Sequence, residues 1–229
     1  MNTHVVNTPS FTTLLAFDDA SILLSQLGSL IEQQYQLLGA NEEFYDHDYL
    51  YNHSLCLKRT NNEDEATTKL IILFNTLFAK QRVQLIHGDN EPEYFPAKHN
   101  QPARIEFAHG FFASALHEIS HWCVAGKARR QLNDFGYWYA PDGRSASQQQ
   151  AFERVEVKPQ AIECLFTLAC QRPFQVSQDN LFADFDTGNS TFANDVYQQV
   201  KHYITSPQSL PRDAQILLYA LLRCITNQL

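Results

Sequence analysis

Residues 111–126 have the sequence FFASALHEISHWCVAG, and this stretch decides the fold. Its apolar side chains around a polar centre predict a half-buried helix over about 111–125, and Gly126 is placed to end it. Inside the stretch, His117, Glu118 and His121 form the pattern H-E-x-x-H. Side chains four positions apart lie on one helix face, with Cβ atoms about 5–6 Å apart. Two imidazoles on that face can bind one metal ion, so the segment predicts a metal-binding helix.

A third ligand is expected from a second long helix, because two histidines rarely complete a metal site. This helix is predicted over about 148–170, with a kink or a restart at Pro159. Four of its side chains share one face at spacings of three, four and three: Glu153, Glu156, Gln160 and Glu163. We expect Glu156 to be the third metal ligand, because it is central in this row and lies between two valines. Glu153 is the second candidate.

A site of two histidines and one carboxylate does not identify its metal. Zinc would polarise a carbonyl and activate water, with Glu118 as the general base, as in H-E-x-x-H peptidases. Iron(II) uses the same three ligands and leaves positions for O₂ and a substrate. Taken alone, these residues favour the zinc peptidase. A binding module with a structural metal is a third possibility, but such sites usually have four ligands and no cysteine is placed to supply one.

The remaining pattern predicts an α+β fold, in which a short mixed sheet packs against helices. Further helices are predicted over 18–38, 64–80, 191–205 and 211–227, strands over 82–86 and 104–107, and loops over 89–96 and 134–147. The organisation changes near residue 60. We therefore expect a mainly helical N-terminal extension, residues 1–62, and a metal-dependent domain, residues 63–229.

Composition narrows the range of partners and compartments. The formal net charge is −8, which argues against nucleic-acid binding, since phosphate contacts need concentrated Lys and Arg. The five cysteines form no C-x-x-C pair and are odd in number, which indicates free thiols in a reducing compartment. No run approaches the roughly 18 apolar residues of a membrane span, and the first residues lack the features of a secretory signal. We expect a cytoplasmic protein with no membrane partner.

Several longer motifs carry a specific resemblance. They are FAHGF (107–111), ALHEISHWC (115–123), AGKARR (125–130), DFGYWYAPDGR (134–144) and FERVEVKPQA (152–161). Together they resemble the elongation factor P hydroxylase family, over roughly residues 64–229. Members of that family hydroxylate the β-lysylated lysine of elongation factor P. They are non-haem metal enzymes with a 2-His-1-carboxylate-like site, in a fold similar to the YbeY endoribonucleases.

The resemblance implies an oxidoreductase whose protein substrate is elongation factor P. It implies His117 and His121 as metal ligands, together with a carboxylate from the Val155-Glu156-Val157 motif. It also implies Fe²⁺ as the metal and O₂ as co-substrate, whereas no motif indicates the electron donor. Glu118 would then orient a ligand or relay protons. A zinc-dependent hydrolase, either a peptidase or by fold analogy a YbeY-like nuclease, is the alternative.

The loop after the metal helix is the expected entrance for substrate. A cationic lysyl-lysine arm favours an acidic entrance with aromatic walls. The residues expected there are Asp134, Tyr137, Trp138, Tyr139 and Asp142. The alternative is that these aromatic rings only pack the loop against the core.

A basic cluster follows the metal helix and consists of Lys127, Arg129 and Arg130. Cations at this position interact favourably with the carbonyl groups at the end of the helix. Contact with an acidic patch on a protein partner is the second interpretation.

Overall fold

The structure is a computed structural model that describes residues 9–38, 49, 62–137, 143–180, 182, 185 and 190–226. The α-helices in this part of the chain are α1 (Phe17–Leu38), α3 (Glu63–Leu77), α4 (Phe112–Arg129), α5 (Ala146–Ala169), α6 (Phe192–Thr205) and α7 (Arg212–Thr226). The strands are β1 (Val83–Gly88), β2 (Glu93–Phe95) and β3 (Ala103–Ala108). The same described residues include short 3₁₀ helices over Ala79–Gln81, Asn133–Gly136 and Pro207–Ser209. The predicted α+β class is confirmed, whereas the likeness to YbeY stays a prediction.

The sheet has the strand order β1-β3-β2. β1 runs parallel to β3, with Val83 opposite Ala103, and β2 runs antiparallel to it, with Tyr94 opposite Ile105. Buried and half-buried residues alternate along β3, as the sequence pattern of a strand predicts. β2 corrects the expectation of a loop over 89–96. A three-residue edge strand flanked by prolines is too short to give a recognisable alternation.

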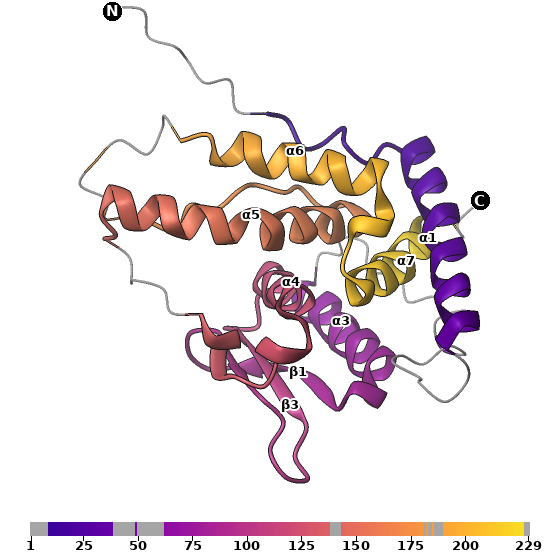
Figure 1. Ribbon diagram of the computed structural model, residues 1–229, viewed down its shortest axis with the longest axis horizontal. Helices are drawn as coiled ribbons and strands as arrows, with labels where there is room; N and C mark the ends of the chain where they lie inside the picture. Colours follow the sequence, from indigo (N-terminus) through magenta and orange to yellow (C-terminus); the bar gives the residue numbers. More distant parts are fainter. Residues whose placement is uncertain are drawn as a thin grey trace, which may run out of the picture.

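The helices pack in successive layers on the sheet. α3 contacts β1, and α4 contacts β3 and α3. On its other side α4 packs against α5, which in turn contacts α6 and α7 (Figure 1). α4 is thus the element that joins the sheet layer to the helical layer, and this arrangement brings α4 and α5 side by side.

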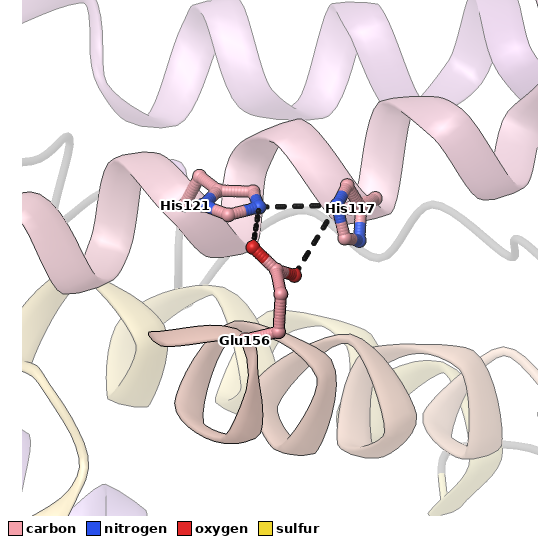
Figure 2. Close-up of side chains that lie close together, drawn as sticks. All are labelled: His117, His121 and Glu156. Atoms are coloured by element: carbon pink, nitrogen blue, oxygen red, sulfur yellow. Dashed lines mark hydrogen bonds and ion pairs between the residues drawn. The ribbon is translucent and has the colours of Figure 1, made fainter. Parts of the chain in front are cut away.

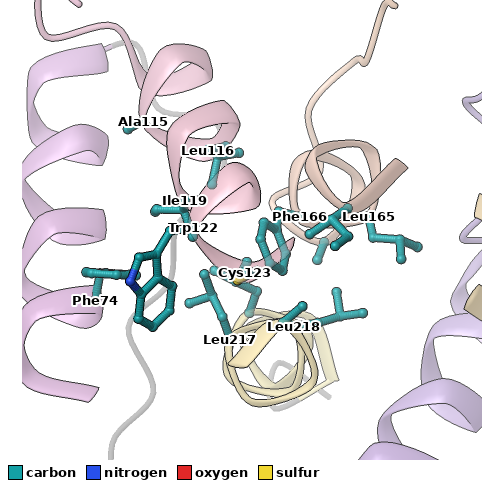
Figure 3. Packing of buried hydrophobic residues seen from close by; sticks show 14 of the residues in the cluster. Phe74, Ala115, Leu116, Ile119, Trp122, Cys123, Leu165, Phe166, Leu217 and Leu218 are labelled. Atoms are coloured by element: carbon teal, nitrogen blue, oxygen red, sulfur yellow. The ribbon is translucent and has the colours of Figure 1, made fainter. Parts of the chain in front are cut away.

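The apolar faces of α4 are buried in the core. Trp122 packs against α3, with its ring centroid 5.3 Å from that of Phe74 (Figure 3). On the other side, Cys123 packs near Phe166 of α5 and Leu217 of α7 (Figure 3). All of these side chains are buried. Because the core fixes α4 on several sides, the face that carries the two histidines has a defined direction.

Two helix boundaries differ from expectation. α4 does not end at Gly126: this residue has φ 68° and ψ 173°, and a further helical turn continues to Arg129. Glycine adopts this backbone conformation without a steric clash, so the chain breaks the helix there and resumes it. Of the kink or restart expected at Pro159, the restart is not seen, because α5 runs from Ala146 to Ala169 as one helix. Buried side chains on both sides of Pro159 hold it in place.

The predicted helix over residues 18–38 is confirmed by α1. Its Leu23, Leu27 and Ile31 are buried and belong to the same hydrophobic cluster as Leu217 and Leu218 of α7. The predicted boundary between residues 62 and 63 stays a prediction. None of the helices in the described part of the chain has the length and apolarity needed to cross a membrane.

Candidate metal centre

The two histidines of the H-E-x-x-H pattern lie on the face of α4 that meets α5. Their Nε2 atoms are 3.0 Å apart. The side chain of His121 is 9% exposed and that of His117 is 29% exposed. The imidazole of His121 is therefore enclosed by the protein, while that of His117 is partly exposed to solvent.

Glu156 of α5 completes the group. Figure 2 shows the three side chains pointing toward one another, the histidines from α4 and the glutamate from α5. Glu156 Oε1 lies 3.4 Å from His121 Nε2, and Glu156 Oε2 lies 3.8 Å from His117 Nε2. The carboxylate is almost fully buried, at 2% exposure. The candidate ligand atoms all lie within 4.8 Å of one another.

These distances fit a single metal ion. Nitrogen and oxygen ligands bind such ions at about 2.0–2.2 Å, which puts two ligand atoms about 3–3.5 Å apart. In addition, Glu156 Oε2 is buried and has no hydrogen-bond partner. An unsatisfied buried carboxylate oxygen is costly, and a bound cation would satisfy it. The donor set therefore suits a divalent metal with nitrogen and oxygen ligands.

The surrounding carboxylates favour positive charge at His117. Burial would lower the pKa of His117, but the hydrogen bond and charge of Glu163, with the charges of two further glutamates, raise it to about 10. Burial acts to raise the pKa of Glu156, but the charges of both histidines outweigh it and lower that pKa. Burial raises the pKa of Glu118; the histidines oppose this shift, and Glu156 and Asp134 add to it.

Glu153, the second candidate ligand, has a different environment. Its Oε1 accepts hydrogen bonds from the side-chain amides of Gln149 and Gln178, both at 3.2 Å. Its Oε2 accepts one from the Ser190 hydroxyl at 2.7 Å. Both of its carboxylate oxygens are therefore engaged elsewhere, and Glu153 is not part of the group that His117, His121 and Glu156 form. Glu153 thus binds the segment between α5 and α6.

The expected entrance loop is described only in part. Asp134 is exposed, and its Oδ1 accepts a hydrogen bond from the Tyr94 backbone N–H at 2.9 Å. The guanidinium of Arg129 lies over the ring of Tyr137, and its central carbon is 4.1 Å from the ring centroid. The other three expected residues, Trp138, Tyr139 and Asp142, lie outside the described residues. The negative charge of Asp134 influences the centre, since it contributes to the raised pKa of Glu118.

Glu163 contacts the centre as well, although the sequence pattern assigned it no role. Its Oε2 lies 2.8 Å from Nδ1 of His117. The signal that pointed to it was its spacing of seven residues from Glu156, which places both carboxylates on one face of α5.

Comparisons with known proteins agree with the motif resemblance. The model of the family described as Elongation factor P hydroxylase matches residues 73–228, which include α4 and α5. The Elongation factor P lysine hydroxylase of Haemophilus influenzae is 47% identical over 154 residues, which are 66% of this chain and 85% of that protein. This chain therefore belongs to the elongation factor P hydroxylase family.

Proposed function

We propose that this protein is an iron-dependent hydroxylase that modifies the β-lysylated lysine of elongation factor P. The observation that carries the proposal is the convergence of His117, His121 and Glu156 in one largely buried group, in a chain of this family. The three side chains would hold Fe²⁺ through two Nε2 atoms and the Glu156 carboxylate. Bound iron with O₂ supplies the oxidising power for an unactivated C–H bond, which acid–base groups lack.

The protein's own residues would bind and orient the substrate and move protons. Glu118 lies beside the histidines on α4 and is half-buried. Because its pKa is raised, the carboxylate is a better proton acceptor than that of an exposed glutamate. We assign it the proton relay at the centre. Asp134, with Tyr137 and Trp138 beside it in sequence, is the proposed contact for the cationic lysyl-lysine arm.

The zinc hydrolase is the competing function, since the same ligands can bind Zn²⁺. In that case Glu118 would activate water. The name of the Haemophilus influenzae relative, a lysine hydroxylase, favours the oxidative reaction. Zinc content with peptide or RNA cleavage, and no oxygen transfer, would support the hydrolase instead.

The intact mass of elongation factor P tests the proposal. The factor is purified from cells whose own hydroxylase gene is deleted and which express either this protein or its His117→Ala variant. With the unaltered protein we expect a gain of one oxygen atom, about 16 Da, and with His117→Ala no gain. His202→Ala, which changes an exposed histidine on α6, is the matched control and should support the full gain. Equal oxygen incorporation by His117→Ala would refute the role of the centre.

A further inference from the structure

The two nitrogens of the His117 ring face two different carboxylates. Nε2 points to the centre, 3.0 Å from His121 Nε2 and 3.8 Å from Glu156 Oε2. Nδ1 lies on the other edge of the ring, 2.8 Å from Glu163 Oε2. The side chain of Glu163 is 14% exposed, so this contact is largely shielded from water.

Both carboxylates come from α5. Glu156 and Glu163 are seven residues apart, which is about two helical turns, and so they lie on one face. The helix is continuous through the intervening Pro159, and the relative position of the two carboxylates is therefore fixed. α5 thus offers one carboxylate to each edge of the His117 ring.

This arrangement determines which nitrogen can bind a cation. A neutral imidazole carries one N–H and one lone pair, and the partner of the N–H decides which nitrogen keeps the lone pair. A carboxylate beside Nδ1 accepts the Nδ1–H and leaves the lone pair on Nε2, toward His121 and Glu156. It also fixes the rotation of the ring.

We propose that Glu163 is a positioning residue for the metal centre, which holds His117 in the tautomer and orientation that present Nε2 to the ion. The inference rests on the proposed metal site. Glu163 itself does not bind the metal, because its contact is with the edge of the ring that faces away from His121 and Glu156.

Metal affinity and the His117 ring proton test this role without any assay of activity. We propose to titrate the metal-free protein and its Glu163→Ala and Glu163→Gln variants with Co²⁺ alone, in competition with a chromophoric chelator. Loss of such a hydrogen-bonded partner weakens metal binding by about 10- to 100-fold, which we expect for Glu163→Ala. Glu163→Gln should lose less metal affinity than Glu163→Ala, since the amide oxygen of glutamine can still accept the hydrogen bond from Nδ1–H of His117. Glu91→Gln, the same change on an exposed loop, is the control and should bind as the unaltered protein does.

The second readout is the ring proton itself. In the Zn²⁺-loaded protein with ¹⁵N-labelled histidine, we expect a slowly exchanging, downfield Nδ1–H resonance from His117. It should be absent from Glu163→Ala and present but shifted in Glu163→Gln. A general loss of packing would not produce this pattern. If Glu163→Ala does not fold, the Co²⁺ affinity and the His117 ring proton of Glu163→Gln, compared with those of the unaltered protein, still test the positioning role.

The outcomes separate the two proposals. Unaltered Co²⁺ affinity and an unaltered His117 ring proton in Glu163→Ala would overturn the positioning role and leave the metal site intact. Loss of binding as complete as in Glu156→Gln would make Glu163 a ligand and would also overturn it. If the unaltered protein binds no Co²⁺, or if His117→Ala binds it equally well, the metal site itself fails and the inference fails with it.

Discussion

At the scale of single residues, Arg130 shows how a charged side chain holds the end of the metal helix. Its Nε donates to the carbonyl oxygen of Trp122 at 2.9 Å, and its guanidinium lies 3.6 Å from the centroid of the Trp122 ring. Its Nη2 pairs with Asp213 Oδ2 of α7 at 2.7 Å, and both side chains are largely buried. The contact with a carbonyl group of α4 agrees with the first of the two interpretations of the basic cluster.

Arg130→Ala should destabilise the protein while leaving the metal centre in place. It removes the closest cation from the buried Asp213, which keeps a hydrogen bond from Gln81 at 2.8 Å and a longer ion pair with Arg212 at 3.8 Å. Breaking a largely buried ion pair of this kind costs about 3 kcal/mol. For a chain of this size the melting temperature should fall by about 6–12 °C, measured by differential scanning calorimetry. Lys127→Ala, an exposed neighbour in the same cluster, should shift stability by less than about 0.5 kcal/mol. Equal melting temperatures for Arg130→Ala and the unaltered protein would contradict this role.

The residues of the candidate centre could be predicted to different extents. The spacing of His117 and His121 placed them on one helix face, because that depends only on helix geometry. Glu156 was favoured over Glu153 by its place in the row, but which carboxylate meets the histidines depends on the rotation of α5 about its axis. Tertiary packing sets that rotation, so it cannot be predicted from a local sequence pattern. The contact between Glu163 and His117 was missed for the same reason.

At the scale of elements, α1 is packed into the core by its contact with α7. Leu27 of α1 is fully buried, whereas Leu37 on the same helix is 85% exposed. The two helices approach closely at Gly28, where a Cβ atom would lie 3.1 Å from the ring of Tyr219. The helix periodicity of residues 18–38 predicted α1, but the partner of its apolar face could not be predicted from that periodicity.

Leu27→Ala tests whether α1 contributes to the stability of the domain. Removing a fully buried leucine side chain leaves a cavity and should cost about 2–5 kcal/mol. Leu37→Ala is the matched control and should change stability by less than about 0.5 kcal/mol. Chemical denaturation followed by circular dichroism measures both. If the two variants unfold at the same denaturant concentration, α1 is not part of the cooperative unit.

At the scale of the whole molecule, the candidate centre lies where the sheet layer meets the helical layer. α4 is fixed by α3 and β3 on one side and by α5 and α7 on another, so its histidine face meets α5 in a defined orientation. The α+β class and most helix ranges followed from apolar periodicity and from glycine and proline positions. The contact between α4 and α5 could not be predicted from these patterns, because it joins residues about 40 positions apart and depends on the packing of the entire core.

The metal content of three purified proteins tests the central claim most directly. Elemental analysis after loading with Fe²⁺ under anaerobic conditions compares the unaltered protein with Glu156→Gln and with Glu153→Gln. We predict close to one equivalent of iron for the unaltered protein and for Glu153→Gln, because Glu153 binds Gln149, Gln178 and Ser190 instead of the histidines. Glu156→Gln should retain little iron, since it loses the charged ligand. Full iron content in Glu156→Gln, or its loss from Glu153→Gln alone, would contradict the proposed centre.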